Sequence, residues 1–150
     1  MKDSLNDVLK SLFSRDLKRL KEEVAAYQHE NHLWIVDKEI NNSGGNLALH
    51  LIGNLRAFIG AELGKTGYIR QRDDEFGLKN VPRQQMLDEI DLTIREIEQV
   101  LDGLSVEQLK AEYPRKVFQY DMTTEFFLVH LASHLGYHLG QLNYHRRLLD

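Results

Sequence analysis

The chain has 150 residues, 42 % of them hydrophobic and 28 % charged, which is enough for one globular domain with a real hydrophobic core. Its formal net charge of −4 argues against a nucleic-acid-binding protein, because such proteins usually carry a strong excess of basic residues. The absence of cysteine excludes disulfides and thiolate metal sites, so a metal site would need histidine or carboxylate ligands.

The N-terminal residues carry charges throughout and lack the apolar run of a signal peptide. No stretch of 18 apolar residues is present that would span a membrane. We therefore expect a cytoplasmic protein that neither crosses a membrane nor binds nucleic acid.

Apolar residues recur at steps of three and four in four segments, which predicts four amphipathic helices. We place these helices at residues 4–28, 43–63, 83–101 and 124 to the end, with Ser4 as the first N-cap and Thr123 or Thr124 as the last. Four helices of about 20 residues, joined by one long crossover loop, predict an all-α four-helix bundle that forms a single domain over residues 1–150.

The crossover loop at residues 64–82 is polar and highly charged. A loop of this length in a compact domain is often functional, and we predict that Arg70 and Arg72 lie at the rim of a pocket. A solvated cluster of charges is the commoner alternative. Within residues 113–123, apolar and polar residues alternate as is typical of a strand. We predict either a hairpin arm or an extended connector there.

Four of the seven histidines lie in the last predicted helix, namely His130, His134, His138 and His145. At about 100° per residue, these four fall within roughly 80° of the helix surface, beside a row of leucines. Imidazoles at the edge of a core are partly desolvated yet can meet water, which suits a metal site. Residues four apart are separated by about 6 Å, so one ion can bind His130 with His134, or His134 with His138.

A further ligand must come from another element, and His50 is the best candidate because it lies mid-helix and faces the core. Taken alone, a histidine on an apolar face is more often a satisfied core residue. Three neutral imidazoles leave a coordination position open, as in catalytic zinc sites, although ligand type does not separate zinc from nickel or iron. His29 and His32 lie in an irregular segment without the four-residue spacing and are disfavoured as ligands.

Other bundle chemistries fit the sequence less well. Ferritin-like di-iron sites need a glutamate three residues before a histidine, and the chain has none. A Ser-His-Asp mechanism would need a nucleophile elbow, which is also missing.

The segments GNLALHLIGNL and HLASHLGYHLGQ together resemble the DinB-like (YfiT-type) superfamily of four-helix-bundle metalloenzymes. The resemblance extends over essentially the whole chain. It implies that His50, His134 and His138 bind a divalent metal, nickel or zinc, and that homodimers are expected. Candidates for positions beside the metal or on the pocket wall are Gln141, Asn54, His130, Arg70 and Arg72. His130 and His145 are then expected either beside the metal ligands or on the surface.

The resemblance does not fix an activity, because better-understood relatives are thiol-dependent transferases and isomerases, whereas many others are described only as hydrolases. We therefore expect a metal-dependent transferase or hydrolase that activates a low-molecular-weight thiol or water, with no catalytic residue assigned beyond the metal ligands. The alternative is a non-catalytic metal-binding or structural bundle involved in stress response.

Overall fold

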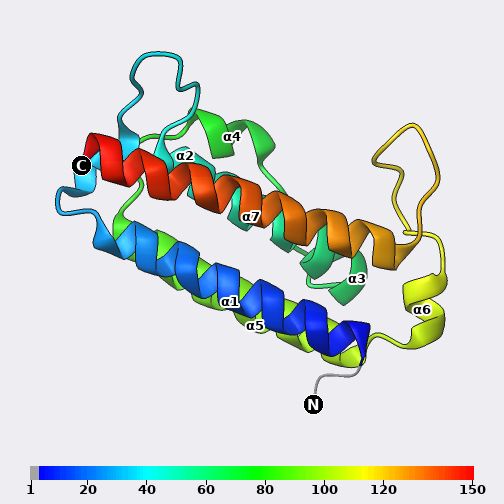
Figure 1. Cartoon of the computed structure of the whole chain (residues 1–150). Helices are drawn as coiled ribbons and strands as arrows, with labels where there is room; N and C mark the ends of the chain where they lie inside the picture. Colours follow the sequence, from blue (N-terminus) through cyan, green and yellow to red (C-terminus); the bar gives the residue numbers. More distant parts are fainter. Residues whose placement is uncertain (1–3) are drawn as a thin grey trace.

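Four long helical segments form the molecule, and residues 4–150 of this computed structural model contain no strand (Figure 1). The segments are α1 (Leu5–Ala26), α2 (Gly44–Leu55), α5 (Arg83–Gly103) and α7 (Thr124–Leu149). The second segment continues past α2 through a π-helix, η2 (Arg56–Ala61), and the short helix α3 (Glu62–Gly64). The prediction of an all-α four-helix bundle is confirmed.

Three shorter helices lie in the connections between these segments. They are the 3-10 helix η1 (Glu30–Trp34), α4 (Arg72–Gly77) and α6 (Val106–Lys110). The predicted polar crossover loop between the second and third long helices contains a helix that was not predicted, because α4 occupies its centre.

Side-chain caps fix where the long helices begin. The side chains of Ser4, Ser43 and Thr123 each accept a hydrogen bond from the backbone N–H three residues later, which satisfies one of the free donors of the first turn. Ser105 and Gln108 form a reciprocal capping box at the start of α6. The predicted starts of the first, second and fourth helices are correct to within one residue.

The segments α1 and α7 run in one direction, whereas α2 and α5 run in the other (Figure 1). The C-terminal ends of α1 and α7 lie together, because the backbone N–H of Gln28 donates to Asp150 Oδ2 at 2.8 Å. The beginning of α5 lies at the same end, since Arg83 donates to the carbonyl oxygen of Tyr27 at 2.6 Å. Consequently α2 and α7 are antiparallel neighbours.

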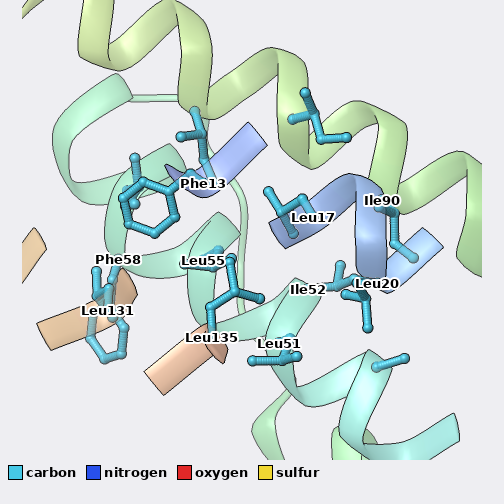
Figure 2. Packing of buried hydrophobic residues seen from close by; sticks show 14 of the residues in the cluster. Phe13, Leu17, Leu20, Leu51, Ile52, Leu55, Phe58, Ile90, Leu131 and Leu135 are labelled. Atoms are coloured by element: carbon cyan, nitrogen blue, oxygen red, sulfur yellow. The ribbon is translucent and has the colours of Figure 1, made fainter. Parts of the chain in front are cut away.

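The core fills the space between all four segments. Figure 2 shows Phe13 and Leu17 of α1, Leu55 of α2, and Leu131 and Leu135 of α7 within one cluster of buried side chains. These five side chains are at most 1 % exposed. Burying each contributes about 1.5–3 kcal/mol, so α2 and α7 are held firmly against each other.

The segment at residues 113–123 is a connector and not a hairpin arm. A single antiparallel bridge joins Glu112 to Thr123, and the Tyr113 N–H donates to the Met122 carbonyl oxygen at 2.9 Å. This bridge closes the loop at its base and leaves Phe118 on the wall of a cavity. Within residues 4–150, none of the helices combines the length and apolarity needed to cross a membrane.

Candidate metal centre

Three histidines from two helices point their Nε2 atoms at one another. His134 Nε2 of α7 lies 3.2 Å from His50 Nε2 of α2 and 3.1 Å from His138 Nε2, one turn further along α7. One ligand atom from each of the three lies within 4.8 Å of the others. Two imidazole nitrogens that share a tetrahedral Zn²⁺ at bond lengths of 2.0–2.1 Å would be about 3.3 Å apart. The spacing therefore fits one divalent cation.

The outer nitrogens of two of these rings determine where the protons sit. His50 Nδ1 lies 3.0 Å from Glu75 Oε1, and His138 Nδ1 lies 2.7 Å from Gln141 Oε1. Because a carboxylate and an amide oxygen can only accept, both Nδ1 atoms donate, and the neutral form of each ring turns an Nε2 lone pair toward His134. The single Nε2 of His134 can donate to only one of them. A cation satisfies all three lone pairs at once, so the donor set fits a bound metal.

Burial keeps the His134 and His138 imidazoles neutral. It lowers the pKa of His134 to about 4, assisted by the neighbouring His138 and His50 rings. Burial also lowers the pKa of His138, against the opposing effect of its bond to Gln141. Since metal ligation requires neutral imidazole, these two rings are in the binding form at pH 7.

Glu75 belongs to the candidate site, although the sequence analysis did not identify it. Its side chain on α4 is buried, with the residue 5 % exposed, and it also accepts from Arg70 Nε at 2.8 Å and from the terminal guanidinium nitrogen at 2.9 Å. Burial alone would raise the pKa of this carboxyl, but the bonds from His50 and Arg70 outweigh it and lower the pKa. Glu75 is thus an anionic acceptor that orients His50.

Two residues of α2 hold α4 in place. Asn46 is fully buried, and its amide donates to the carbonyl oxygens of Glu75 and Leu78, both at 2.9 Å. At Gly53, a Cβ atom would overlap the Glu75 carboxylate, so glycine allows α4 to approach α2 this closely.

A cavity of about 460 Å³ opens beside the three histidines. Phe58, Phe76, Phe118 and Phe127 line it, together with two arginines and no carboxylate. Arg70 is committed to Glu75, as described above. The guanidinium of Arg72 lies 5.3 Å from the ring centroid of Phe76 and contacts no carboxylate among residues 4–150. The cavity therefore offers an apolar wall and one unneutralised positive charge.

A second cavity of about 420 Å³ lies along the C-terminal half of α7. Its walls combine the apolar side chains of Ile40, Leu47 and Leu148 and the rings of Tyr137 and Tyr144 with polar residues that include Glu39. Both cavities include His138 and Asn42 in their linings. The two cavities therefore adjoin at His138, one of the three candidate ligands.

The sequence profile of the DinB superfamily matches residues 12–142, which is most of the chain. The chain belongs to the DinB superfamily. A crystal structure described as a conserved protein from Enterococcus faecalis has the same fold, with a TM-score of 0.78, 17 % identity and 98 % of each chain covered. The comparison with curated proteins gives no significant match.

The other predicted pocket residues of this DinB-superfamily chain differ in how they lie relative to the three histidines. Gln141 contacts His138, and Arg70 and Arg72 line the larger cavity, as described above. His130 also lines it, but its exposed ring stacks on Phe127, with centroids 5.7 Å apart, and lies outside the cluster. Asn54 is 7 % exposed on the same wall.

The prediction for His145 was wrong, because this residue is neither beside the metal centre nor on the surface. It is 3 % exposed, and its Nε2–H donates to the Ile35 carbonyl oxygen at 2.8 Å. Its Nδ1 accepts from the Tyr27 hydroxyl at 2.6 Å. His145 therefore fastens α7 to the segment that follows α1. His32 pairs instead with Asp150, away from the cluster.

Proposed function

We propose that the protein is a metal-dependent transferase or hydrolase in which His50, His134 and His138 hold one nickel or zinc ion. The observation that carries this proposal is the convergence of three Nε2 atoms, with two of the rings oriented by acceptors on their outer nitrogens. When bound, such an ion lowers the pKa of a coordinated thiol or water toward neutrality.

The substrate side of the proposal is supported by the larger cavity. Arg72 supplies a positive charge that a carboxylate or another anionic group can pair with, and guanidinium groups bind carboxylates bidentately. Four phenylalanine rings line the space beside the histidines, and such an apolar wall lowers the local dielectric and strengthens electrostatic contacts there. We therefore propose a small anionic substrate, and a low-molecular-weight thiol with carboxylates has this chemistry.

The second cavity favours a transferase over a hydrolase. A group transfer brings two organic substrates to one centre, whereas hydrolysis needs only one besides water. The cavity with Arg72 and the cavity with Tyr137 and Tyr144 share His138, so each can present a substrate to the same centre.

The test is thermal unfolding of the metal-loaded protein with small dicarboxylate thiols, followed by assays of thiol transfer to electrophiles and of ester hydrolysis. A ligand at about 100 times its Kd stabilises by roughly 2.7 kcal/mol, which raises Tm by roughly 5–10 °C. We expect this shift in the wild type and in Arg95→Ala, an exposed arginine on α5, and its loss in Arg72→Ala.

Two results would contradict parts of the proposal. If thiols protect Arg72→Ala as well as the wild type, the role of Arg72 fails. If the protein holds a metal, yet no thiol or ester protects it or is turned over, the non-catalytic metal-binding bundle becomes the better account.

A further inference from the structure

Two buried polar atoms near the candidate metal centre have no hydrogen-bond partner. Within residues 4–150, Asn54 Oδ1 and His134 Nδ1 are the only buried side-chain atoms in this condition. Both residues line the larger cavity. An unpaired buried polar group is costly, so the occurrence of two in one place calls for an explanation.

His134 Nδ1 must be a donor when this ring binds a metal. Its Nε2 faces the two other histidines, so the proton of the neutral ring resides on Nδ1. Histidines that ligate metals almost always donate this second N–H to a carboxylate, a carbonyl or a water. His50 and His138 already have such acceptors in Glu75 and Gln141, whereas His134 has none.

Asn54 is positioned to supply the missing acceptor. It lies one turn after His50 on the same face of α2, and one turn further Phe58 meets Phe127 of α7, with ring centroids 5.1 Å apart. Since α2 and α7 are antiparallel, Asn54 lies between the contact of His50 with His134 and the contact of Phe58 with Phe127. Asn54 therefore faces the turn of α7 that comes just before His134.

We infer that Asn54 Oδ1 accepts the His134 Nδ1–H bond in the metal-bound protein, so that each ligand imidazole is oriented by its own acceptor. This inference rests on the proposed metal centre and makes Asn54 a positioning residue. The direct bond requires rotation of the two side chains, because they are not hydrogen-bonded in the structure. Contact between this oxygen and a substrate is disfavoured, because the atom is buried from solvent.

The test compares the Zn²⁺ affinity of Asn54→Leu and Asn54→Asp, measured by competition with a chromophoric chelator. Leucine removes the acceptor, and we expect affinity to fall by roughly 10-fold or more, as for other residues that orient metal ligands. Aspartate keeps an acceptor oxygen and should restore affinity to near the wild-type value. Asn42→Leu is the matched control, since it removes another amide that lines this cavity, and it should bind like the wild type.

The metal-free protein supplies a separate readout. Replacing an unpaired buried amide with leucine should leave its unfolding midpoint unchanged or raise it, so weaker Zn²⁺ binding would not reflect misfolding. In the Zn²⁺-bound wild type and Asn54→Asp, proton NMR should show a slowly exchanging His134 Nδ1–H resonance. This resonance should exchange rapidly in Asn54→Leu.

The inference is overturned if Asn54→Leu binds Zn²⁺ like the wild type, if Asn54→Asp is as weak as Asn54→Leu, or if Asn42→Leu loses as much affinity. In these cases the wild type still binds Zn²⁺ and the proposed metal centre stands. If the wild type binds no divalent metal, the proposed function and this inference both fall.

Discussion

At the scale of single residues, substitution of Glu75 tests the candidate metal site. Its carboxylate pairs with both His50 and Arg70, so Glu75→Gln leaves the ring with a weaker acceptor and the guanidinium without a full counter-charge. We expect Zn²⁺ affinity to fall by roughly 10–100-fold and stability to drop by about 1–3 kcal/mol. Competition titration and urea unfolding measure the two effects.

Asp73→Asn is the matched control for this substitution. Asp73 lies on the same short helix but is exposed, so its loss should change neither quantity appreciably. Equal effects in both variants would mean that the charge of α4, and not the contact with His50, determines Zn²⁺ affinity and stability.

His145 allows a prediction about pH. Burial lowers the pKa of His145, and the bond to the Ile35 carbonyl oxygen only partly opposes this. The unfolded chain has the ordinary pKa near 6.5, so below that pH the unfolded state binds more protons than the folded state. The stability contributed by neutral His145 is fully present above about pH 6.5 and is lost as the pH falls toward the folded pKa.

Urea unfolding of the chelator-treated protein between pH 7.5 and 5 measures this contribution. Stability should fall less steeply with decreasing pH in His145→Gln than in the wild type, because glutamine does not titrate. His134 and His138 remain in both proteins and cancel in the comparison. Identical slopes would show that His145 is not protonated on unfolding in this range.

At the scale of elements, the position of α4 depends on Gly53. In Gly53→Ala the new Cβ overlaps the Glu75 carboxylate, so α4 must shift away from α2. We expect Zn²⁺ affinity to fall in Gly53→Ala as it does in Glu75→Gln. The free energy of unfolding should fall by about 1–3 kcal/mol, as at other overpacked sites. The control is Gly140→Ala on α7, where nothing lies near the new Cβ and a gain of up to about 1 kcal/mol is expected. Unchanged metal binding in Gly53→Ala would show that metal binding does not depend on the position of α4.

The elements differ in how far the sequence could predict them. The long helices were predictable because each has a sustained apolar stripe and three of them begin at a hydroxyl cap, such as Ser43 or Thr123. Helix α4 was not, because it is six residues long and mostly charged, so it has no apolar periodicity to detect. Its position depends on Asn46, which lies 29 residues before Glu75 and donates to the Glu75 carbonyl oxygen.

The site was predictable to a similar degree. Spacing within α7 left two histidine pairs open, and the family resemblance chose His134 with His138, the pair that the structure brings together with His50. Spacing could not separate His145 from the other three, because all lie in one wedge of the helix. The partner that buries His145, Tyr27, comes from the other end of the chain and leaves no local signal.

At the scale of the whole molecule, we propose a homodimer formed through the outer face of α7. Phe126, Tyr137, Tyr144 and Leu148 are 50–72 % exposed and fall within about 40° of one another around the helix. Light scattering should give twice the protomer mass of 17.5 kDa for the wild type and for Val8→Ser, an exposed control on α1. The double variant Tyr137→Ser with Leu148→Ser should give the mass of one protomer. A wild-type mass of 17.5 kDa would contradict the proposal.

The outer face of α7 also forms part of a cavity wall, because Tyr137, Tyr144 and Leu148 line the second cavity. A partner seated on α7 would narrow this cavity from outside, while the larger cavity with Arg72 remains open. The candidate metal centre thus adjoins two cavities, one that holds Arg72 and one beside the exposed face of α7.

The measurement that tests the central claim most directly is elemental analysis of untagged protein, in the wild type, His134→Ala and His130→Ala. We predict about one divalent ion per chain in the wild type and in His130→Ala, because His130 lies outside the cluster. His134→Ala should lose the ion, since it removes the ring that contacts both His50 and His138. A wild type without metal, or a His134→Ala variant that keeps it, would contradict the account.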